Sequence, residues 1–248
     1  SGVDMRIFMV NPAGIIFGSG SHVNVTQLVA SGLNMSDVDF LNATDGSPAD
    51  FRFEGGTWSP GNNGVVENWG TIQANSVYLV GRQVSNIAGE IKANNGLVVL
   101  AAGDNVYLAQ DGSSVIVEVA GPSDYLYDID NRTGIIARNG KIVLAAGDTF
   151  SRAIKNASWL AAQGGSIEAR AARIENTGVI TTSSSDTDGG TIKLTGVEEV
   201  IMTTDERPTE KRITADGGAN GGTITIESPE GTVTIAEGTL VSARGGNG

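Results

Sequence analysis

The sequence has no cysteine and only one histidine. The missing cysteines exclude disulfide bonds, thiol catalysis and cysteine-ligated zinc. The single histidine, His22, has no second imidazole to join it in a metal site or a catalytic pair, so we expect it to be a surface residue. Apolar runs are also short, and none approaches the about 18 residues that span a bilayer. We therefore expect no membrane insertion.

Basic residues are scarce and scattered along the chain. The 16 Lys and Arg residues are outnumbered by 28 Asp and Glu residues, which gives a net charge of −12 and an isoelectric point near 4.4. Nucleic acids and anionic membrane surfaces are bound by clustered positive charge. We therefore expect the chain to bind no nucleic acid and to be repelled by anionic membranes.

Glycine is abundant, at 35 of 248 residues, and it occurs with many Val, Ile and Thr residues. This combination, without a collagen-like period, favours short strands joined by tight turns. The strongest repeat is IKANNGLVVLAAGD, residues 91–104, against IIARNGKIVLAAGD, residues 135–148, which agree at 10 of 14 positions and start 44 residues apart. Looser copies lie at residues 69–81, 177–196 and 212–228. Such repetition is typical of solenoids and propellers.

The strand spacing favours a solenoid over the other repeat folds. Propeller blades need about 40–50 residues, and leucine-rich repeats need a Leu/Asn framework that this sequence lacks. A half-period of about 20–22 residues would instead hold two or three short strands. We predict an all-β fold, a parallel β-helix with about twenty residues in each circuit. Roughly nine to eleven circuits would stack about 4.8 Å apart, with almost no helix.

Alternation in GTITIES and GTVTIAEG predicts which side chains fill the core, because successive strand residues point to opposite faces. The inward set is Ile224, Ile226, Val233 and Ile235. Two segments break the repeat, near residues 37–64 and 105–131. We predict that both leave the solenoid as extra-helical strands or hairpins, which lie on its flank or cover exposed edges.

The stretch NPAGIIFG, residues 11–18, combines turn and strand signals. Its Asn-Pro pair and its glycine indicate a turn, and its Ile-Ile-Phe indicates a short buried strand. We expect a β-turn in which the proline presets φ and the glycine takes a positive φ. The residues of this candidate functional turn are Asn11, Pro12, Ala13, Gly14 and Ile15.

Three segments in order resemble the filamentous-haemagglutinin-type secretion domain. They are NPAGIIFG, then GSHVNVTQLVASGLNMSDVDFLNA at residues 20–43, then VYLVGRQVSNIAGEIKANNGLVVLAAGD at residues 77–104. That domain lies at the N-terminus of TpsA exoproteins, which Gram-negative bacteria export by two-partner secretion. The resemblance assigns residues 1–162 to the domain and residues 163–248 to the β-helical repeats that follow it. The family usually has Asn at the position of Ala13, and it carries an earlier NPNL-type motif and a cap, so we expect this chain to lack the start of the domain.

The resemblance implies a right-handed parallel β-helix with flanking extra-helical strands. It also implies that the POTRA domains of a TpsB outer-membrane transporter recognise the chain, and that the NPAGI turn belongs to the address they read. The exoprotein, often an adhesin, would pass the barrel unfolded and fold outside, secreted or at the cell surface. Distal parts of it would bind receptors on host or neighbouring cells. We expect no enzymatic activity and no cofactor.

Two other functions fit a β-helix. One is a purely structural rod that spaces a distal effector from the cell. The other is a polysaccharide lyase or hydrolase, which needs clustered carboxylates on one face. The candidate carboxylates are Asp128 with Asp130, and Asp186 with Asp188. Each pair also fits a polar turn or a solvated strand face, and neither has calcium-loop spacing, so we expect no metal site.

Five asparagines satisfy the N-x-[ST] pattern and are candidate glycosylation sites, because some adhesins of the family are modified at such positions. They are Asn24, Asn34, Asn42, Asn131 and Asn156. Stacked asparagine ladders inside the turns of the solenoid are a second explanation for abundant Asn.

Overall fold

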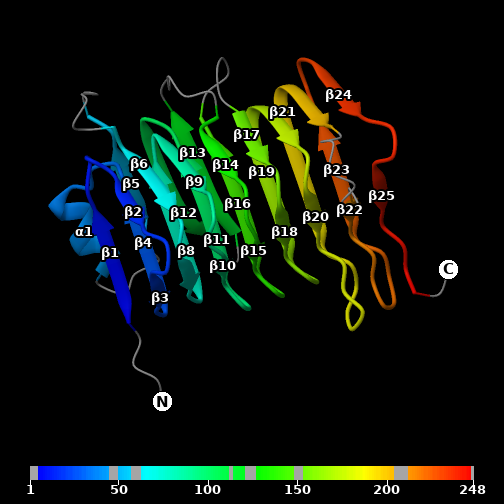
Figure 1. Cartoon of the computed structure of the whole chain (residues 1–248), viewed down its shortest axis with the longest axis horizontal. Coiled ribbons are helices and arrows are strands. Elements are labelled where there is room, and N and C mark those ends of the chain that lie inside the picture. The colour runs from blue at the N-terminus through cyan, green and yellow to red at the C-terminus, as the bar shows by residue number, and fades with distance from the viewer. Residues whose placement is uncertain are drawn as a thin grey trace.

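Successive circuits of the chain stack along one axis, from the N-terminal circuit to the C-terminal one (Figure 1). Each circuit passes through three faces, and strands of neighbouring circuits pair in parallel on every face. This computed structural model describes residues 5–44, 50–56, 63–111, 114–120, 127–147, 153–203 and 212–246. The fold is a parallel β-helix, as the sequence predicts.

The chain meets the three faces in the same order in every circuit. The first face holds β1 (Arg6–Val10), β4 (Gln27–Ser31), β8 (Ser76–Gly81), β11 (Leu97–Ala102), β16 (Lys141–Ala146) and β23 (Thr223–Glu227). The second face holds β2 (Ile15–Phe17), β6 (Val65–Asn68), β9 (Gln83–Asn86), β14 (Ile129–Asn131), β17 (Ala153–Asn156) and β24 (Thr232–Ile235). The long strands β19 (Ser166–Asn176) and β21 (Thr191–Met202) run across both of these faces and join them into one sheet.

The third face is a separate eight-stranded sheet. It holds β3 (His22–Asn24), β7 (Thr71–Gln73), β10 (Ile91–Lys92), β15 (Ile135–Ile136), β18 (Trp159–Ala161), β20 (Val179–Thr181), β22 (Arg212–Thr214) and β25 (Leu240–Ser242). Because each circuit supplies one strand to this face, the described chain makes eight circuits, fewer than the nine to eleven expected.

The two LAAGD copies lie on adjacent circuits. In the pairing of β11 with β16, Val99 is opposite Val143, so the repeat is in register as predicted. The 44-residue offset between the copies is therefore one circuit, and the expected half-period is wrong at this point. The extra length is the excursion that contains β12 (Asn105–Asp111) and β13 (Ser114–Ala120). Such excursions consume residues without adding circuits, which accounts for the lower count.

The interior of the solenoid is filled by apolar side chains stacked in columns. One column runs through Leu28, Val77, Val98, Ile142, Ile167 and Ile192, all buried and each in register with the next. Ile224 and Ile226 continue this face inward, opposite Ile192 and Leu194, as the alternation predicts. Val233 and Ile235 align with the buried Val200 and Met202, but they are 40% and 49% exposed because no described strand pairs with the outer edge of β24.

The two excursions combine into one extra-helical sheet. The first contains α1 (Asp37–Thr44) and β5 (Phe51–Glu54), and the second contains the β12–β13 hairpin. Strand β5 pairs antiparallel with β12, so the two segments meet although about 50 residues separate them in sequence. This sheet packs on the outside of the first face through a second apolar cluster. The described parts of the excursions therefore cover the first face of the solenoid, and Phe40 of α1 also packs against Phe8 of the edge strand β1.

A ladder of buried asparagines stabilises one corner of the solenoid, at the end of the second face. In four successive pairs an Asn donates from Nδ2 to Oδ1 of the Asn in the next circuit, at 2.7–2.9 Å, and the last Asn donates to the carbonyl of Gly178 at 3.1 Å. The rungs are Asn68, Asn86, Asn131, Asn156 and Asn176. A buried amide without partners would cost about 1–3 kcal/mol, so the stacking satisfies groups that would otherwise destabilise the fold.

A second corner requires residues with unusual backbone freedom. Asn95 and Asn139, at matching places in the repeat, have φ of 55° and 53°. Asparagine tolerates this left-handed region better than most residues. The glycine that follows each of them packs against the previous circuit: a Cβ on Gly140 would clash with the carbonyl of Gly96. These requirements account for much of the Asn and Gly content of the turns.

Candidate functional site

The turn from Asn11 to Gly14 connects β1 and β2 in the first circuit. The N–H of Gly14 donates to the carbonyl of Asn11 at 2.8 Å, which closes a β-turn. The Asn11 side chain reinforces it, because Oδ1 accepts from the N–H of Ala13 at 3.2 Å and Nδ2 donates to the carbonyl of Gly14 at 3.0 Å. Gly14 has φ of 110°, as expected. The turn is therefore closed by its own residues.

Two other circuit segments hold the turn in place. The N–H of Asn11 donates to the carbonyl of Ser31 at 2.9 Å, and the N–H of Gly64 donates to the carbonyl of Pro12 at 3.0 Å. A side chain at Gly14 would bring its Cβ within 2.9 Å of the Val65 carbonyl, so the turn lies directly against the neighbouring backbone. Its geometry thus depends on residues that follow it by 20 and 52 positions.

The turn combines exposed side chains with a fixed backbone. Asn11 and Ala13 are exposed, Pro12 and Gly14 are half-buried, and Ile15 begins β2 and packs against the interior cluster. A partner could therefore contact the exposed Asn11 and Ala13 without disturbing the core. The sequence predicts the turn and its glycine, and the structure brings all of the candidate residues together.

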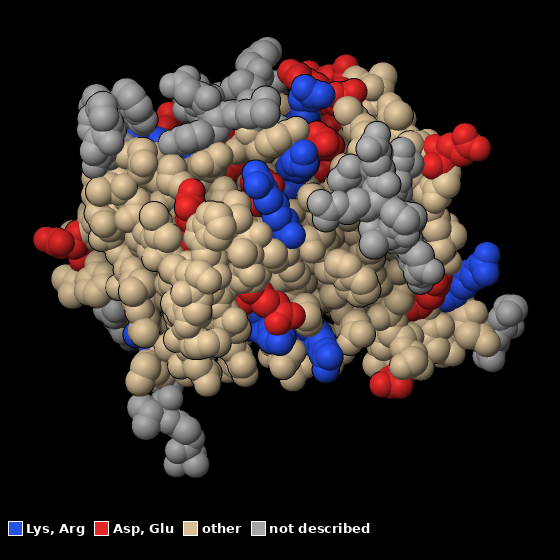
Figure 2. Space-filling view, viewed as in Figure 1, with Lys and Arg blue, Asp and Glu red and all other residues tan. Residues whose placement is uncertain are grey.

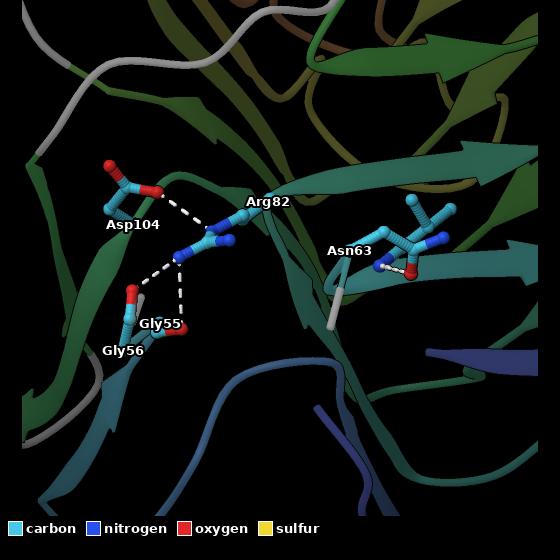
Figure 3. A network of polar contacts seen from close by, with 6 residues as sticks. Gly55, Gly56, Asn63, Arg82 and Asp104 are labelled. Atoms are coloured by element: carbon cyan, nitrogen blue, oxygen red, sulfur yellow. Dashed lines mark hydrogen bonds and ion pairs between the residues drawn. The ribbon is translucent and has the colours of Figure 1, made fainter. Parts of the chain in front are cut away.

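A buried arginine near this turn was not a candidate from sequence. Arg82 follows β8, and its Nε donates to Oδ1 of Asp104 at 2.9 Å (Figure 3). Its Nη2 donates to the carbonyls of Gly55 and Gly56 at 2.9 and 2.6 Å. Charged side chains are rarely buried without such partners. The available signal was a lone Arg between a glycine and an apolar strand, in VGRQV.

The viewed surface shows no broad area of one charge (Figure 2). Basic and acidic side chains intermingle on it. Ion pairs link neighbouring circuits of the solenoid, such as Lys155 with Glu175 at 3.7 Å and Arg173 with Glu199 at 2.7 Å. Tyr127 donates to Glu175 at 2.9 Å, and burial together with this acceptor raises the pKa of its phenol. The contacts of Tyr127 with Glu175 and with Lys155, whose ammonium lies 4.9 Å from the ring centroid, hold the segment before β14 against the second face.

The candidate carboxylate pairs occupy different environments. Asp128 and Asp130 are buried, and Asp130 pairs with Arg132 through Oδ2 at 2.6 Å. Asp186 and Asp188 are exposed, and Asp188 accepts from the side chain of Asn220 at 3.1 Å. Among the described residues no group of three or more His, Asp and Glu side chains is arranged to hold a metal ion.

The candidate glycosylation residues fall into two groups. Asn24 and Asn34 are exposed, whereas Asn131 and Asn156 are ladder rungs, buried with their amides hydrogen-bonded. In the folded protein the latter two amides are inaccessible. The side chain of Asn42 lies outside the described part of the chain. His22 is exposed on β3, as the sequence predicts.

The comparisons with known proteins concern the fold. No protein-family model matches the chain, and no curated protein matches it in sequence. Within the described residues, no helix is long and apolar enough to cross a membrane. Among solved structures, the chain is similar to the secretion domain of HMW1 from Haemophilus influenzae, with a TM-score of 0.53 and 17% identity. The match covers 96% of this chain and 80% of that one, so the likeness extends over almost the whole β-helix described above.

Proposed function

We propose that this chain is the secretion domain of a TpsA-type exoprotein, recognised by the POTRA domains of a TpsB outer-membrane transporter. The observation that carries the proposal is the NPAGI turn, closed and exposed in the first circuit, on a fold similar to the HMW1 secretion domain. The extra-helical sheet over the first face is consistent with the secretion-domain resemblance of the sequence. The exoprotein would be secreted or displayed at the cell surface.

The architecture suits export of an unfolded chain followed by folding outside. Within the solenoid each circuit pairs only with its neighbours, so circuits can form in order as the chain emerges. The extra-helical pairing of β5 with β12 forms later, because it joins the second circuit to the fourth. The chain contains no cysteine, so no crosslinked loop has to pass the transporter. Each new circuit buries apolar side chains, and this burial would favour outward movement without another energy source.

Secretion of altered exoproteins tests the proposal. Asn11→Ala with Pro12→Ala, made in the natural exoprotein with its native flanking sequence, should lower the amount exported through the transporter and leave synthesis unchanged. Asn24→Ala is the matched control, since Asn24 is an exposed asparagine of the same first circuit. Export of the turn variant at the control level would refute the role of the turn.

Under this proposal the chain is not an enzyme and has no cofactor. Carbohydrate cleavage would require two carboxylates that converge on a bound sugar. The expectation is that the purified chain leaves polysaccharides intact, and a variant lacking the carboxylates of Asp186 and Asp188 provides the comparison. Receptor binding would reside in other parts of the exoprotein, for which this β-helix also acts as a rod.

A further inference from the structure

Arg82 joins three parts of the molecule that are distant in sequence. Its backbone belongs to the solenoid, directly after β8. Its guanidinium contacts the end of β5, through the Gly55 and Gly56 carbonyls, and the residue before β12, Asp104. The N–H of Gly55 also donates to the carbonyl of Asp104 at 2.6 Å. One side chain, 6% exposed, thus fastens both excursions to the circuit beneath them (Figure 3).

The backbone of the same residue is connected to the NPAGI turn. The N–H of Arg82 donates to the carbonyl of Gly64 at 2.8 Å, and the N–H of Gly64 donates to the carbonyl of Pro12 at 3.0 Å. Two consecutive hydrogen bonds therefore lead from the arginine to the turn. They pass through Gly64, which has φ of 65° and directly precedes β6.

Gly64 has little freedom to move independently of Arg82. A Cβ on Gly64 would lie 3.1 Å from Cγ of Arg82 and 3.1 Å from the carbonyl oxygen of Gly32. A Cβ on Gly81 would lie 2.5 Å from the carbonyl oxygen of Gly64. Close packing of this kind transmits a displacement of the arginine to the glycine, and from there to the turn.

We propose that Arg82 is a positioning residue for the NPAGI turn, coupling its geometry to the docking of the extra-helical sheet. A guanidinium is suited to this task because its planar fork can reach a carboxylate and carbonyls at once, which a lysine ammonium cannot do in the same geometry. The functional meaning of the coupling rests on the secretion role proposed above. The turn then reaches its final form only after the chain as far as Asp104 has assembled.

Hydrogen–deuterium exchange of single amides tests the coupling in the chain itself. In Arg82→Met, exchange of the Gly64 and Gly14 amides should accelerate by about tenfold or more, together with that of Gly55. Arg82→Lys should behave like Arg82→Met. Arg173→Met, which removes an exposed arginine paired with Glu199, is the matched control and should leave these amides unchanged.

A second control separates coupling from general loosening. Phe53→Ala removes a buried ring from the contact between β5 and the solenoid without touching Arg82. It should accelerate exchange in β5 and β12 and have a smaller effect on Gly14 than Arg82→Met. The proposal is overturned if Gly14 and Gly64 exchange as in the wild type when Arg82 is replaced, or if Phe53→Ala accelerates Gly14 just as much in a chain that already carries Arg82→Met.

Secretion assays on the full exoprotein keep the two proposals apart. Arg82→Met should lower export by a similar factor to the double substitution in the turn. If both variants are exported normally while the exchange rates change as described, the secretion role of the turn fails and the physical coupling stands. If only the Arg82 variant is exported normally, the positioning role of Arg82 in secretion is refuted.

Discussion

The first face of the solenoid has a covered region and a bare region, and the difference lies in its outward side chains. A single outward column runs through Phe8, Val29, Tyr78, Val99, Val143, Glu168, Lys193 and Thr225, each in register with the next. The column changes from apolar to charged or polar between β16 and β19. The extra-helical sheet covers the apolar part, where Phe51 packs on Tyr78 at 5.6 Å between ring centroids.

The comparison explains two sequence patterns in one fold. In the covered circuits both sides of a strand are buried, so the sequence is a continuous apolar run such as LVVLAA. In the bare circuits only the inner side is buried, and TIKLTG and TITIE alternate. The bare surface carries ion pairs between circuits, such as Lys193 with Glu227, and Lys141 with Glu168 spans the boundary between the two regions. A change from a continuous apolar run to alternating apolar and polar residues thus marks the circuit at which the extra-helical sheet ends.

The largest predicted effect comes from placing a charge in the covered column. Val99→Asp would bury a carboxylate between the solenoid and the extra-helical sheet, and it should cost about 4 kcal/mol or detach the sheet. Thr225→Asp, in the same column on the bare side, should change the free energy of unfolding by less than about 0.5 kcal/mol. Chemical denaturation measures both, and equal losses would contradict the division into two regions.

A smaller effect is expected from the asparagine ladder, which should not depend on the cover. Asn86→Ala and Asn156→Ala each remove a buried amide that bonds to rungs on both sides. Each should cost about 1–3 kcal/mol because partners are left unsatisfied. Asn86 belongs to a circuit whose first-face strand, β8, is covered by the extra-helical sheet, and Asn156 belongs to the circuit of β16, at the margin of that cover. A loss confined to Asn86→Ala would show that the cover, and not the ladder, stabilises this corner.

The smallest effects are expected at extremes of pH, with opposite signs for a covered residue of the first face and for a residue of the C-terminal circuits. Burial raises the pKa of Tyr78, beneath the cover, above its usual 10.0, so stability from the neutral phenol is complete below that value and is lost as pH rises through the raised pKa. At Asp216 burial opposes ionisation, but the Arg244 N–H and the Ser242 hydroxyl outweigh it and lower the pKa below 3.8. That stability is complete above pH 3.8 and is lost on acidification.

Exchange measured at both extremes tests these signs. At high pH the amides of β8 and β11 should lose protection first, and at low pH those of β22 and β25. Tyr78→Phe and Asp216→Asn should each abolish the corresponding dependence. The assignment of the high-pH effect to the circuits around Tyr78 would be wrong if the C-terminal circuits lost protection at high pH and Tyr78→Phe prevented that loss.

Much of the architecture could be predicted because the repeat is strong. The matching LAAGD copies place Val99 opposite Val143, and alternation identifies Ile224 and Ile226 as inward residues, as found. The number of circuits could not be predicted, because a strand in an excursion has the same composition as a strand in the solenoid. The pairing of β5 with β12 is a long-range contact that no local pattern encodes.

The helix and the buried arginine show two different limits of sequence reasoning. Helix α1 begins with a capping signal that was present: Ser36 accepts from the N–H of Asp39 at 3.1 Å and donates to its carboxylate. The helix is short and its apolar residues are largely exposed, so no helical period reveals it. Arg82 is different, because its role depends on Asp104 and Gly55, whose positions follow only from the assembled fold.

The ladder of asparagines has a direction, since every rung donates toward the C-terminus. Each circuit that folds onto the previous one therefore meets a side-chain N–H donor. This donor is satisfied only when the asparagine Oδ1 of the new circuit is aligned with it. If the register of the new circuit shifted by one residue, a side chain of the opposite face would replace the asparagine. The buried N–H donor would then have no acceptor. The ladder thus favours pairing of each circuit in the correct register with the one before it, because a circuit that pairs out of register loses a buried hydrogen bond at once.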